Sequence, residues 1–208
     1  MSGTKPSGDV YTLWGGALSL FSGKVRSYLI KKGLPFRELS PSHPRFKTEV
    51  VPAVRLVVVP ILEIGSGEFF QDSTDIITEL ERRYPDSPMV PSTPVQRTVA
   101  HLLDGYGCES LLAAAMHYRW SYRAEQELFL QAEFGRAMHL GPDRAVRLQA
   151  GAQFMSYFSG FLPNLGVTPE TIPAIEAAYE ELLDLLDIHF QHHPYLLGGR
   201  PSIADFGL

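Results

Sequence analysis

The spacing of apolar residues predicts strands only in the first part of the chain. Four short stretches rich in apolar and β-branched residues are typical of strands, at 10–14, at 35–39, around Pro60 and at 68–71. Apolar residues at helical spacing predict two helices among them, over about 22–33 and 73–84. With a loop at 40–46, the predicted order of elements is β-α-β followed by β-β-α.

The rest of the chain has the periodicity of helices alone. Four prolines within residues 84–94 indicate a stiff, extended linker. After it, apolar residues recur at helical spacing over about 95–122, 124–140, 143–161 and 170–192. We therefore expect an α/β domain at 1–84, which opens with a flexible lead at 1–9, then a linker at 85–94 and an all-helical domain at 95–208.

The last residues carry the signal of a helix start. Ser202 and Asp205 have the spacing of a capping box, which predicts a helix that begins at about 203. Six residues remain before the sequence stops at Leu208, and a helix of that length is not stable alone. We therefore expect the natural protein to continue past Leu208, so that the helical domain is incomplete in this sequence.

Composition and charge exclude several classes of protein. The chain has 208 residues, of which 45% are hydrophobic and 20% charged, as in a globular protein. The formal net charge is -5 and no block of Lys and Arg occurs, so nucleic-acid binding is not expected. No apolar run reaches about 18 residues, and the N-terminus has no apolar leader segment. We expect neither a membrane span nor secretion.

The cysteine and histidine residues indicate the cellular location of the protein and whether it binds a metal. The single cysteine, Cys108, forms no internal disulfide and belongs to no CxxC pair, which favours a reducing, cytoplasmic location. His189, His192 and His193 cluster at the end of a predicted helix, without a second set of metal ligands. Compensation of the helix dipole is the preferred interpretation of this cluster, and no metal is expected.

Residues 59–73 combine two features that suggest a binding site. Pro60 interrupts an apolar strand pattern, and it is either an ordinary trans proline of an edge strand or a cis proline. Asp72 and Ser73 stand at the start of a predicted helix, where free N–H groups and the positive end of the dipole suit a carboxylate. Both residues are also good N-caps, so capping is the alternative interpretation.

Four motifs resemble those of glutathione S-transferases, in the order and nearly the spacing of that family. They are LSLFSGKVRSYLIKKGLPF from Leu18, VVPIL around Pro60, DSTDII from Asp72 and GGRPSIADF from Gly198. Together they extend over the whole chain. The resemblance implies an α/β thioredoxin-like N-terminal domain, an all-α C-terminal helical domain and a glutathione site between them.

The resemblance also implies how the tripeptide is held. Pro60 would be cis, and the backbone of Val59 would pair with the cysteinyl part of glutathione as with an added strand. Ser73 would hold the γ-glutamyl carboxylate. Asp72, at a position where the family usually has glutamate, would face the ammonium group of the ligand.

Two serines are candidates for stabilising the glutathione thiolate. Ser19 aligns with the activating residue of several transferase classes, and Ser22 aligns with the second position of the same motif. Ser22 is also expected to cap the following helix. Leu20 stands where the family usually has proline, and Tyr11 is a weaker candidate because the tyrosine of tyrosine-type classes lies nearer the end of the strand.

We therefore expect an enzyme similar to glutathione S-transferases, which conjugates the glutathione thiolate to a small hydrophobic electrophile. The resemblance further implies a homodimer. The segment MHYRWSYR at 116–123 would line the acceptor pocket, through Tyr118, Arg119 or Trp120, or would pack between helices, which we favour. The alternatives are a non-catalytic binding or interaction protein with this fold, and a glutathione-dependent dehalogenase, isomerase or peroxidase.

Overall fold

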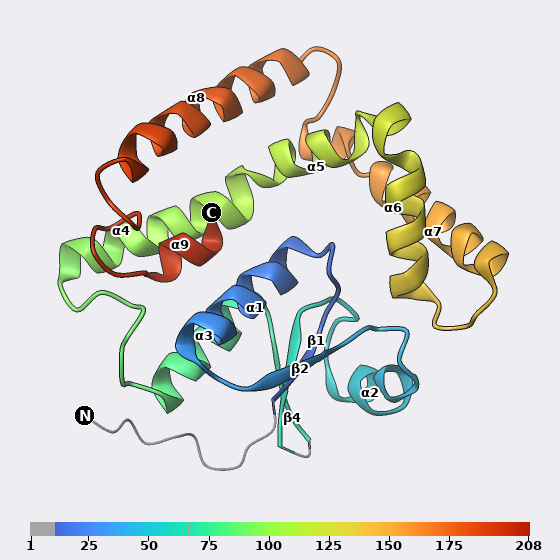
Figure 1. Cartoon of the computed structure of the whole chain (residues 1–208), viewed down its shortest axis with the longest axis horizontal. Coiled ribbons are helices and arrows are strands. Elements are labelled where there is room, and N and C mark those ends of the chain that lie inside the picture. Colours follow the sequence, from blue (N-terminus) through green and yellow to red (C-terminus); the bar gives the residue numbers. More distant parts are fainter. Residues whose placement is uncertain (1–10, 66) are drawn as a thin grey trace. The chain divides into compact units, whose positions relative to one another are not determined.

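The computed structural model describes residues 11–65 and 67–208 (Figure 1). They divide into two compact units. The first unit comprises the described residues up to Pro88 together with Glu133–Ala150, and the second comprises Met89–Ala132 and Gly151–Leu208. The predicted lead at 1–9, and Val10 of the first predicted strand, lie outside the described residues.

In its described residues the first unit is built on a four-stranded mixed sheet. The strands are β1 Tyr11–Trp14, β2 Phe36–Leu39, β3 Ile61–Ile64 and β4 Glu68–Gln71, and they lie in the order β2-β1-β3-β4. The helix α1 (Leu20–Lys32) connects the parallel strands β1 and β2, whereas β3 is antiparallel to β1 and β4. The thioredoxin-like order predicted from the sequence is confirmed.

The helices α1 and α3 (Ser73–Arg83) lie side by side and contact the sheet (Figure 1). They bury the apolar positions that the sequence pattern predicts, namely Val25, Tyr28 and Leu29 of α1 and Ile76, Ile77 and Leu80 of α3. The Tyr28 hydroxyl and the Lys32 ammonium both donate to Glu81 Oε1, at 2.6 and 2.7 Å. As predicted, α1 ends at Gly33, whose φ of 73° lies in the left-handed region.

A second apolar cluster of this unit lies under a short helical segment that the sequence pattern did not predict. The π-helical turn η1 (Phe46–Val50) continues into α2 (Val51–Ala53). Phe46 and Val50 pack with Trp14 and Ile61 of the sheet. The segment has eight residues, barely two turns, which is too short for a helical period to appear in the sequence.

The structure corrects the strand predicted around Pro60. β3 begins only at Ile61, and residues 56–58 are exposed and lie outside the sheet. A side chain holds the backbone of this segment in place of a neighbouring strand. Gln71 Nε2 donates to the carbonyl oxygens of Leu56, at 2.6 Å, and of Val58, at 2.9 Å. An apolar run therefore predicted a strand where the chain forms a braced loop.

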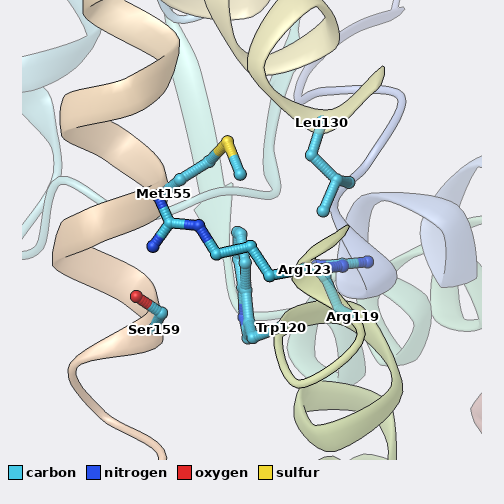
Figure 2. Close-up of a pocket in the computed structure, with 6 residues that line it drawn as sticks. All are labelled: Arg119, Trp120, Arg123, Leu130, Met155 and Ser159. Atoms are coloured by element: carbon cyan, nitrogen blue, oxygen red, sulfur yellow. The ribbon is translucent and has the colours of Figure 1, made fainter. Parts of the chain in front are cut away.

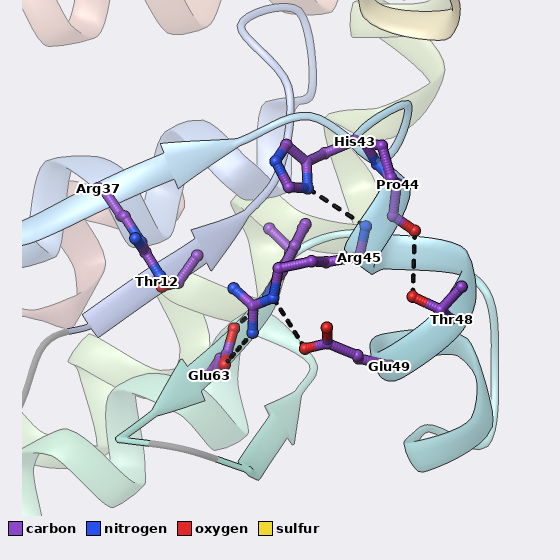
Figure 3. A network of polar contacts seen from close by, with 9 residues as sticks. Thr12, Arg37, His43, Pro44, Arg45, Thr48, Glu49 and Glu63 are labelled. Atoms are coloured by element: carbon purple, nitrogen blue, oxygen red, sulfur yellow. Dashed lines mark hydrogen bonds and ion pairs between the residues drawn. The ribbon is translucent and has the colours of Figure 1, made fainter.

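A buried carboxylate ties the η1–α2 segment to the sheet (Figure 3). Glu63 of β3 is 3% exposed, and it accepts hydrogen bonds from Trp14 Nε1 at 2.9 Å and from the Arg45 guanidinium at 2.8 Å. Arg45 also donates to Glu49 at 2.8 Å, and its guanidinium carbon lies 5.5 Å from the centre of the Trp14 ring. Both oxygens of the buried carboxylate are thus satisfied, as a charge in an apolar environment requires.

The described residues after Pro88 form helices and no strand, which confirms the predicted helical class. The helices are α4 Pro94–Gly105, η2 Tyr106–Ser110, α5 Leu112–Trp120, α6 Arg123–Met138, α7 Arg144–Ser159, η3 Pro163–Leu165, α8 Ile172–Phe190 and α9 Ile203–Gly207. Among the described helices, none is long and apolar enough to cross a lipid bilayer.

The helix predicted over 95–122 is divided into α4, η2 and α5, and glycine contacts with η2 and α4 hold the short α9. A Cβ on Gly107, in the π-helical turn η2, would clash with the carbonyl oxygen of Gly207 in α9. A Cβ on Gly207 would clash with Asp104 of α4. The predicted capping box of Ser202 and Asp205 is present and starts α9. Backbone contact of this closeness stabilises a helix that its length alone would not.

We expect the substitution Arg45→Met to lower the free energy of unfolding by about 2 kcal/mol, because it leaves the Glu63 carboxylate buried with one partner fewer. Urea-induced unfolding followed by circular dichroism measures this change. The matched control is Arg82→Met, which removes an exposed ion pair with Glu79 and is expected to change stability little. Equal losses in both variants would contradict the role given to Glu63.

Candidate functional site

One end of the sheet in the first unit gathers three segments. Trp14 pairs with Ile61, and Ile61 pairs with Gln71, so these residues form one row across β1, β3 and β4. β1 and β4 end at this row and β3 begins there. The loop from β1 to α1, the Val59–Pro60 peptide and the start of α3 therefore meet at the same end of the sheet. All six residues predicted for the site lie there, namely Ser19, Ser22, Val59, Pro60, Asp72 and Ser73.

Ser19, and not Ser22, caps α1. Ser19 has an extended backbone conformation, and its Oγ accepts a hydrogen bond from the Ser22 N–H at 3.2 Å. Because the hydroxyl accepts in this contact, its own proton remains available for donation. The prediction that Ser22 caps the helix was wrong, since the helix begins two residues earlier at Leu20. Ser22 is fully buried, and its Oγ has no hydrogen-bond partner among the described residues.

Close packing fixes the loop ahead of α1. A Cβ on Gly15 would lie 2.7 Å from Ser22 Oγ, so only glycine fits at this position. Arg26 of α1 donates to both carboxylate oxygens of Glu38 in β2, at 2.7 Å each, and to the carbonyl oxygen of Gly16 at 3.2 Å. A bidentate arginine of this kind holds its partners in a fixed geometry. The loop is thus tied to both α1 and β2.

The peptide bond between Val59 and Pro60 is cis. Pro60 is buried, whereas Val59 is half-buried and packs against the cluster of Trp14 and Phe46. Val59 lies outside the strand ladder, which begins at Ile61. The Gln71 amide braces the residues just before it. The backbone of Val59 is therefore held at the end of the sheet without belonging to a strand.

Asp72 and Ser73 begin α3 as predicted. Asp72 is the exposed N-cap, and its Oδ1 accepts from the N–H groups of Thr74, at 2.7 Å, and Asp75, at 3.4 Å. These bonds accompany a φ of 76°, which is unusual for a residue with a side chain. Ser73 is the first residue of the helix and is 4% exposed. The buried ammonium of Lys24, from α1, donates to Thr74 Oγ1 at 3.0 Å.

The electrostatics of this end of the sheet favour a negatively charged ligand. Both α1 and α3 begin there, and the first turn of a helix presents unpaired N–H groups and the positive end of its dipole. Lys24 adds a buried positive charge between the two helices. A terminal carboxylate matches this arrangement, because it suits a helix start.

Other predicted candidates are used for packing. Tyr11 is fully buried, and its hydroxyl contacts the Tyr84 hydroxyl. Cys108 is half-buried in the π-helical turn η2. His189 Nε2 lies 3.1 Å from the carbonyl oxygen of Tyr195. Within the described part of the chain, no group of three or more His, Cys, Asp or Glu side chains is arranged to hold a metal ion.

In the segment 116–123, Met116, His117 and Trp120 are buried, whereas residues 121–123 are exposed. His117 of α5 is buried, with Nδ1 2.8 Å from Ser121 Oγ and Nε2 2.9 Å from Glu176 Oε1 in α8. The Tyr122 hydroxyl donates to the same carboxylate oxygen at 2.6 Å, which raises the pKa of Tyr122 to about 12. The same two hydrogen bonds lower the pKa of Glu176. Tyr118 stacks on Tyr122, with ring centres 5.9 Å apart.

The sequence did not reveal the residues that support the site, which are Gln71, Arg26 and Lys24. Each acts on a partner distant along the chain, so no local spacing marks the pair. Gln71 ends a predicted strand and directly precedes a predicted helix start. A polar residue at such a junction was the one signal in the sequence that could have identified Gln71 as a residue supporting the site. The pairing of Arg26 with Glu38 follows only once β1 and β2 are known to be parallel neighbours.

Comparisons with known proteins agree with this geometry. Residues 13–88 match the family model described as the glutathione S-transferase N-terminal domain. A glutathione S-transferase from Rhodospirillum rubrum F11 is 17% identical, with a TM-score of 0.58 over 95% of this chain and 74% of that chain. Human glutathione transferase theta-2, in complex with glutathione and an unknown ligand, is 17% identical, with a TM-score of 0.57 over 95% and 68%.

A third similar structure is FzlA from C. crescentus, which is 19% identical, with a TM-score of 0.55 over 95% of this chain and 74% of that chain. No curated protein sequence matches the chain. The fold is that of the glutathione S-transferases, with a thioredoxin-like unit and a helical unit. Residues 13–88 thus match the N-terminal domain of that family, and both this match and the fold agree with the resemblance found in the sequence motifs.

The two serines of the α1 motif are expected to affect stability in opposite ways. Ser19→Ala removes an N-cap and should lower the free energy of unfolding by about 1 kcal/mol. Ser22→Ala removes a buried hydroxyl that has no partner among the described residues, and should leave stability unchanged or raise it. Thermal and urea unfolding of both variants measure the difference. A larger loss in Ser22→Ala than in Ser19→Ala would contradict the assignment of the cap.

Proposed function

We propose that the protein binds glutathione at the end of the sheet where α1 and α3 begin, and that Ser19 stabilises its thiolate. The observation that supports this most is the convergence of three groups at one end of the sheet. They are the capping hydroxyl of Ser19, the backbone of Val59 and the buried Ser73 at the start of α3. Each of them suits a different part of one extended peptide.

The backbone of Val59 would pair with the cysteinyl residue of glutathione, as a strand edge pairs with an added strand. The γ-glutamyl carboxylate would lie at the start of α3, with the N–H and hydroxyl of Ser73 as donors and the helix dipole in its favour. Asp72 is exposed, and only its Oδ1 accepts from the helix start, which leaves Oδ2 to face the ligand's ammonium group.

The thiol of the bound tripeptide must lose its proton to react. A free thiol titrates near about 8.5, and lowering its pKa by about two units takes roughly 2.7 kcal/mol of preferential stabilisation of the thiolate. A hydroxyl donor and a helix start supply effects of this size. Ser19 offers both, because its proton is not used in capping. Leu20, in place of the family's proline, still begins the helix directly after Ser19.

The reaction we infer is attack of the thiolate on a small hydrophobic electrophile, by positioning and thiolate stabilisation. Dehalogenation, isomerisation or peroxide reduction would use the same thiolate. Such chemistry, together with a single cysteine in the sequence, fits a cytoplasmic protein. A non-catalytic binding protein is the second candidate. The exposed apolar residues 56–58 next to the proposed site favour it, since contiguous exposed apolar residues can mark a contact surface.

Calorimetric titration with glutathione tests the site. We expect saturable binding to the wild-type protein and binding weaker by about tenfold or more in Ser73→Ala, because a hydrogen bond to a charged carboxylate is lost. The matched control is Ser27→Ala, an exposed serine of α1 outside the site, which should bind like the wild type. Lack of binding to the folded wild-type protein would leave the assigned fold unchanged and favour the non-catalytic interaction protein.

The pKa of the bound thiol tests the role of Ser19. In the wild-type complex we expect thiolate absorbance to appear below the free value of about 8.5. Ser19→Ala should raise this pKa towards the free value while leaving the affinity for the thiol form nearly unchanged, because the thiolate loses a donor and the thiol does not. The difference absorbance of the complex against pH measures it. An unshifted profile in Ser19→Ala would exclude Ser19 as the donor.

We also propose that the protein forms a homodimer through α4. The residues Val95, Val99, Leu102 and Tyr106 recur at helical spacing and are all exposed. A contiguous apolar stripe of this kind on a surface helix indicates a protein contact. Leu102→Glu is therefore expected to give a monomer in analytical ultracentrifugation, whereas Leu128→Glu, at an even more exposed leucine of α6, should not. A monomeric wild-type protein at micromolar concentration would refute the dimer.

A further inference from the structure

The second unit holds a small cavity that the proposed glutathione chemistry does not use. It has a volume of about 30 Å³ and is lined by Arg119, Trp120, Arg123, Leu130, Met155 and Ser159. In Figure 2, α7 contributes Met155 and Ser159 on one side, while Leu130 of α6 and Arg119 of α5 lie on the other. The indole of Trp120 lies between these two sides (Figure 2). The cavity is thus built entirely from helices α5, α6 and α7.

The two arginines that line the cavity differ in their partners. Arg123 donates to Glu127 Oε1 from two of its guanidinium nitrogens, at 3.0 and 2.7 Å, so its charge is compensated at the surface. Arg119 is half-buried and makes no hydrogen bond or ion pair with any described residue. Burial lowers the pKa of Arg119, which reflects the cost of its desolvation. None of the described residues that line the cavity is acidic.

A half-buried guanidinium without a protein partner is costly unless an anion or water compensates its charge. The other residues that line the cavity indicate which kind of ligand could compensate this charge. The side chains of Trp120, Leu130 and Met155 form the apolar part of the lining, and Trp120 is only 7% exposed. The Ser159 hydroxyl donates a long hydrogen bond of 3.3 Å to the carbonyl oxygen of Ser156, and it can turn to donate to a ligand instead. The cavity therefore offers one guanidinium that lacks a partner among the described residues, a second guanidinium that Glu127 compensates, one hydroxyl and an apolar surface.

We propose that this cavity binds the carboxylate group of a small monocarboxylic acid, with Arg119 as its counter-charge and Ser159 as a second donor. The planar fork of a guanidinium matches the two oxygens of a carboxylate, which distinguishes this ligand from a spherical anion such as chloride. One water needs about 10–15 Å³, so the cavity has room for the head of the acid and little more. A short alkyl group would lie against Trp120 and Met155. None of its lining residues belongs to the sheet or to α1 or α3, which carry the proposed glutathione site.

Titration with acetate, observed by nuclear magnetic resonance, tests this proposal in the full chain. The sequence contains two tryptophans, so two indole N–H signals report on the protein, and Trp120→Phe assigns them. At constant ionic strength in chloride, we expect acetate to shift the Trp120 signal with saturation and to leave the signal of Trp14 in place. Acetamide, which has the same shape without the charge, should produce no saturable shift.

Arginine variants distinguish acetate binding in the cavity from a general effect of salt on the protein. Arg119→Gln is expected to weaken acetate binding by about tenfold or more, because a charge-assisted pair is lost. The matched control is Arg82→Gln, which removes the same charge at an exposed position of α3 outside the cavity and should leave the acetate affinity unchanged. Saturating glutathione should leave the acetate affinity unchanged.

Several outcomes would overturn the proposal. They are a linear shift without saturation, equal shifts of both indoles, equal binding by Arg119→Gln, and competition between acetate and glutathione. If Arg119→Gln does not fold, Arg119→Lys keeps the charge but loses the planar fork, and it should bind acetate several-fold more weakly. The wild-type titration decides the question without any variant, because no saturable shift of Trp120 means that water alone compensates Arg119.

Discussion

The register of three strands is the constraint on which the candidate site depends. Trp14, Ile61 and Gln71 align in one row, so the loop before α1, the Val59–Pro60 peptide and the start of α3 meet at one end of the sheet. Successive side chains of a strand point to opposite faces, so a slip of one residue would turn Glu63 away from Trp14 and Arg45. The buried carboxylate of Glu63 therefore penalises any other register, since it would lose both partners.

Local patterns in the sequence were sufficient to predict most helices and strands and the residues at which several of them begin or end. The helix starts at Asp72 and Ser202 and the helix end at Gly33 follow from backbone chemistry within a few residues, and the structure has them in place. The same holds for the buried stripe of α3, because its period is that of one isolated helix. The order of the strands then follows from the family motifs around them.

Contacts between segments that are distant in the sequence could not be predicted from such local patterns. The apolar residues 56–58 predicted a strand, but Gln71 braces them as an exposed loop. Ser22 looked like a cap because a serine near a helix start usually is one, yet Ser19 takes that role and Ser22 is buried against Gly15. In the helical unit, the half-buried charge of Arg119 became visible only with the packing of α5, α6 and α7. Each of these depends on which side chains meet across the fold.

The contact between Gly15 and Ser22 constrains how this chain can change in evolution. A Cβ at position 15 would lie 2.7 Å from the Ser22 hydroxyl oxygen and 3.0 Å from its Cβ, so a larger residue at 15 requires a smaller one at 22. A substitution at position 22 can come first, because alanine or glycine at position 22 leaves the glycine at position 15 without a clash. We therefore expect the two positions to vary together among relatives, with any change at 22 arising first. The loop that carries Ser19 would then have a preferred mutational path, set by a clash of a few tenths of an ångström.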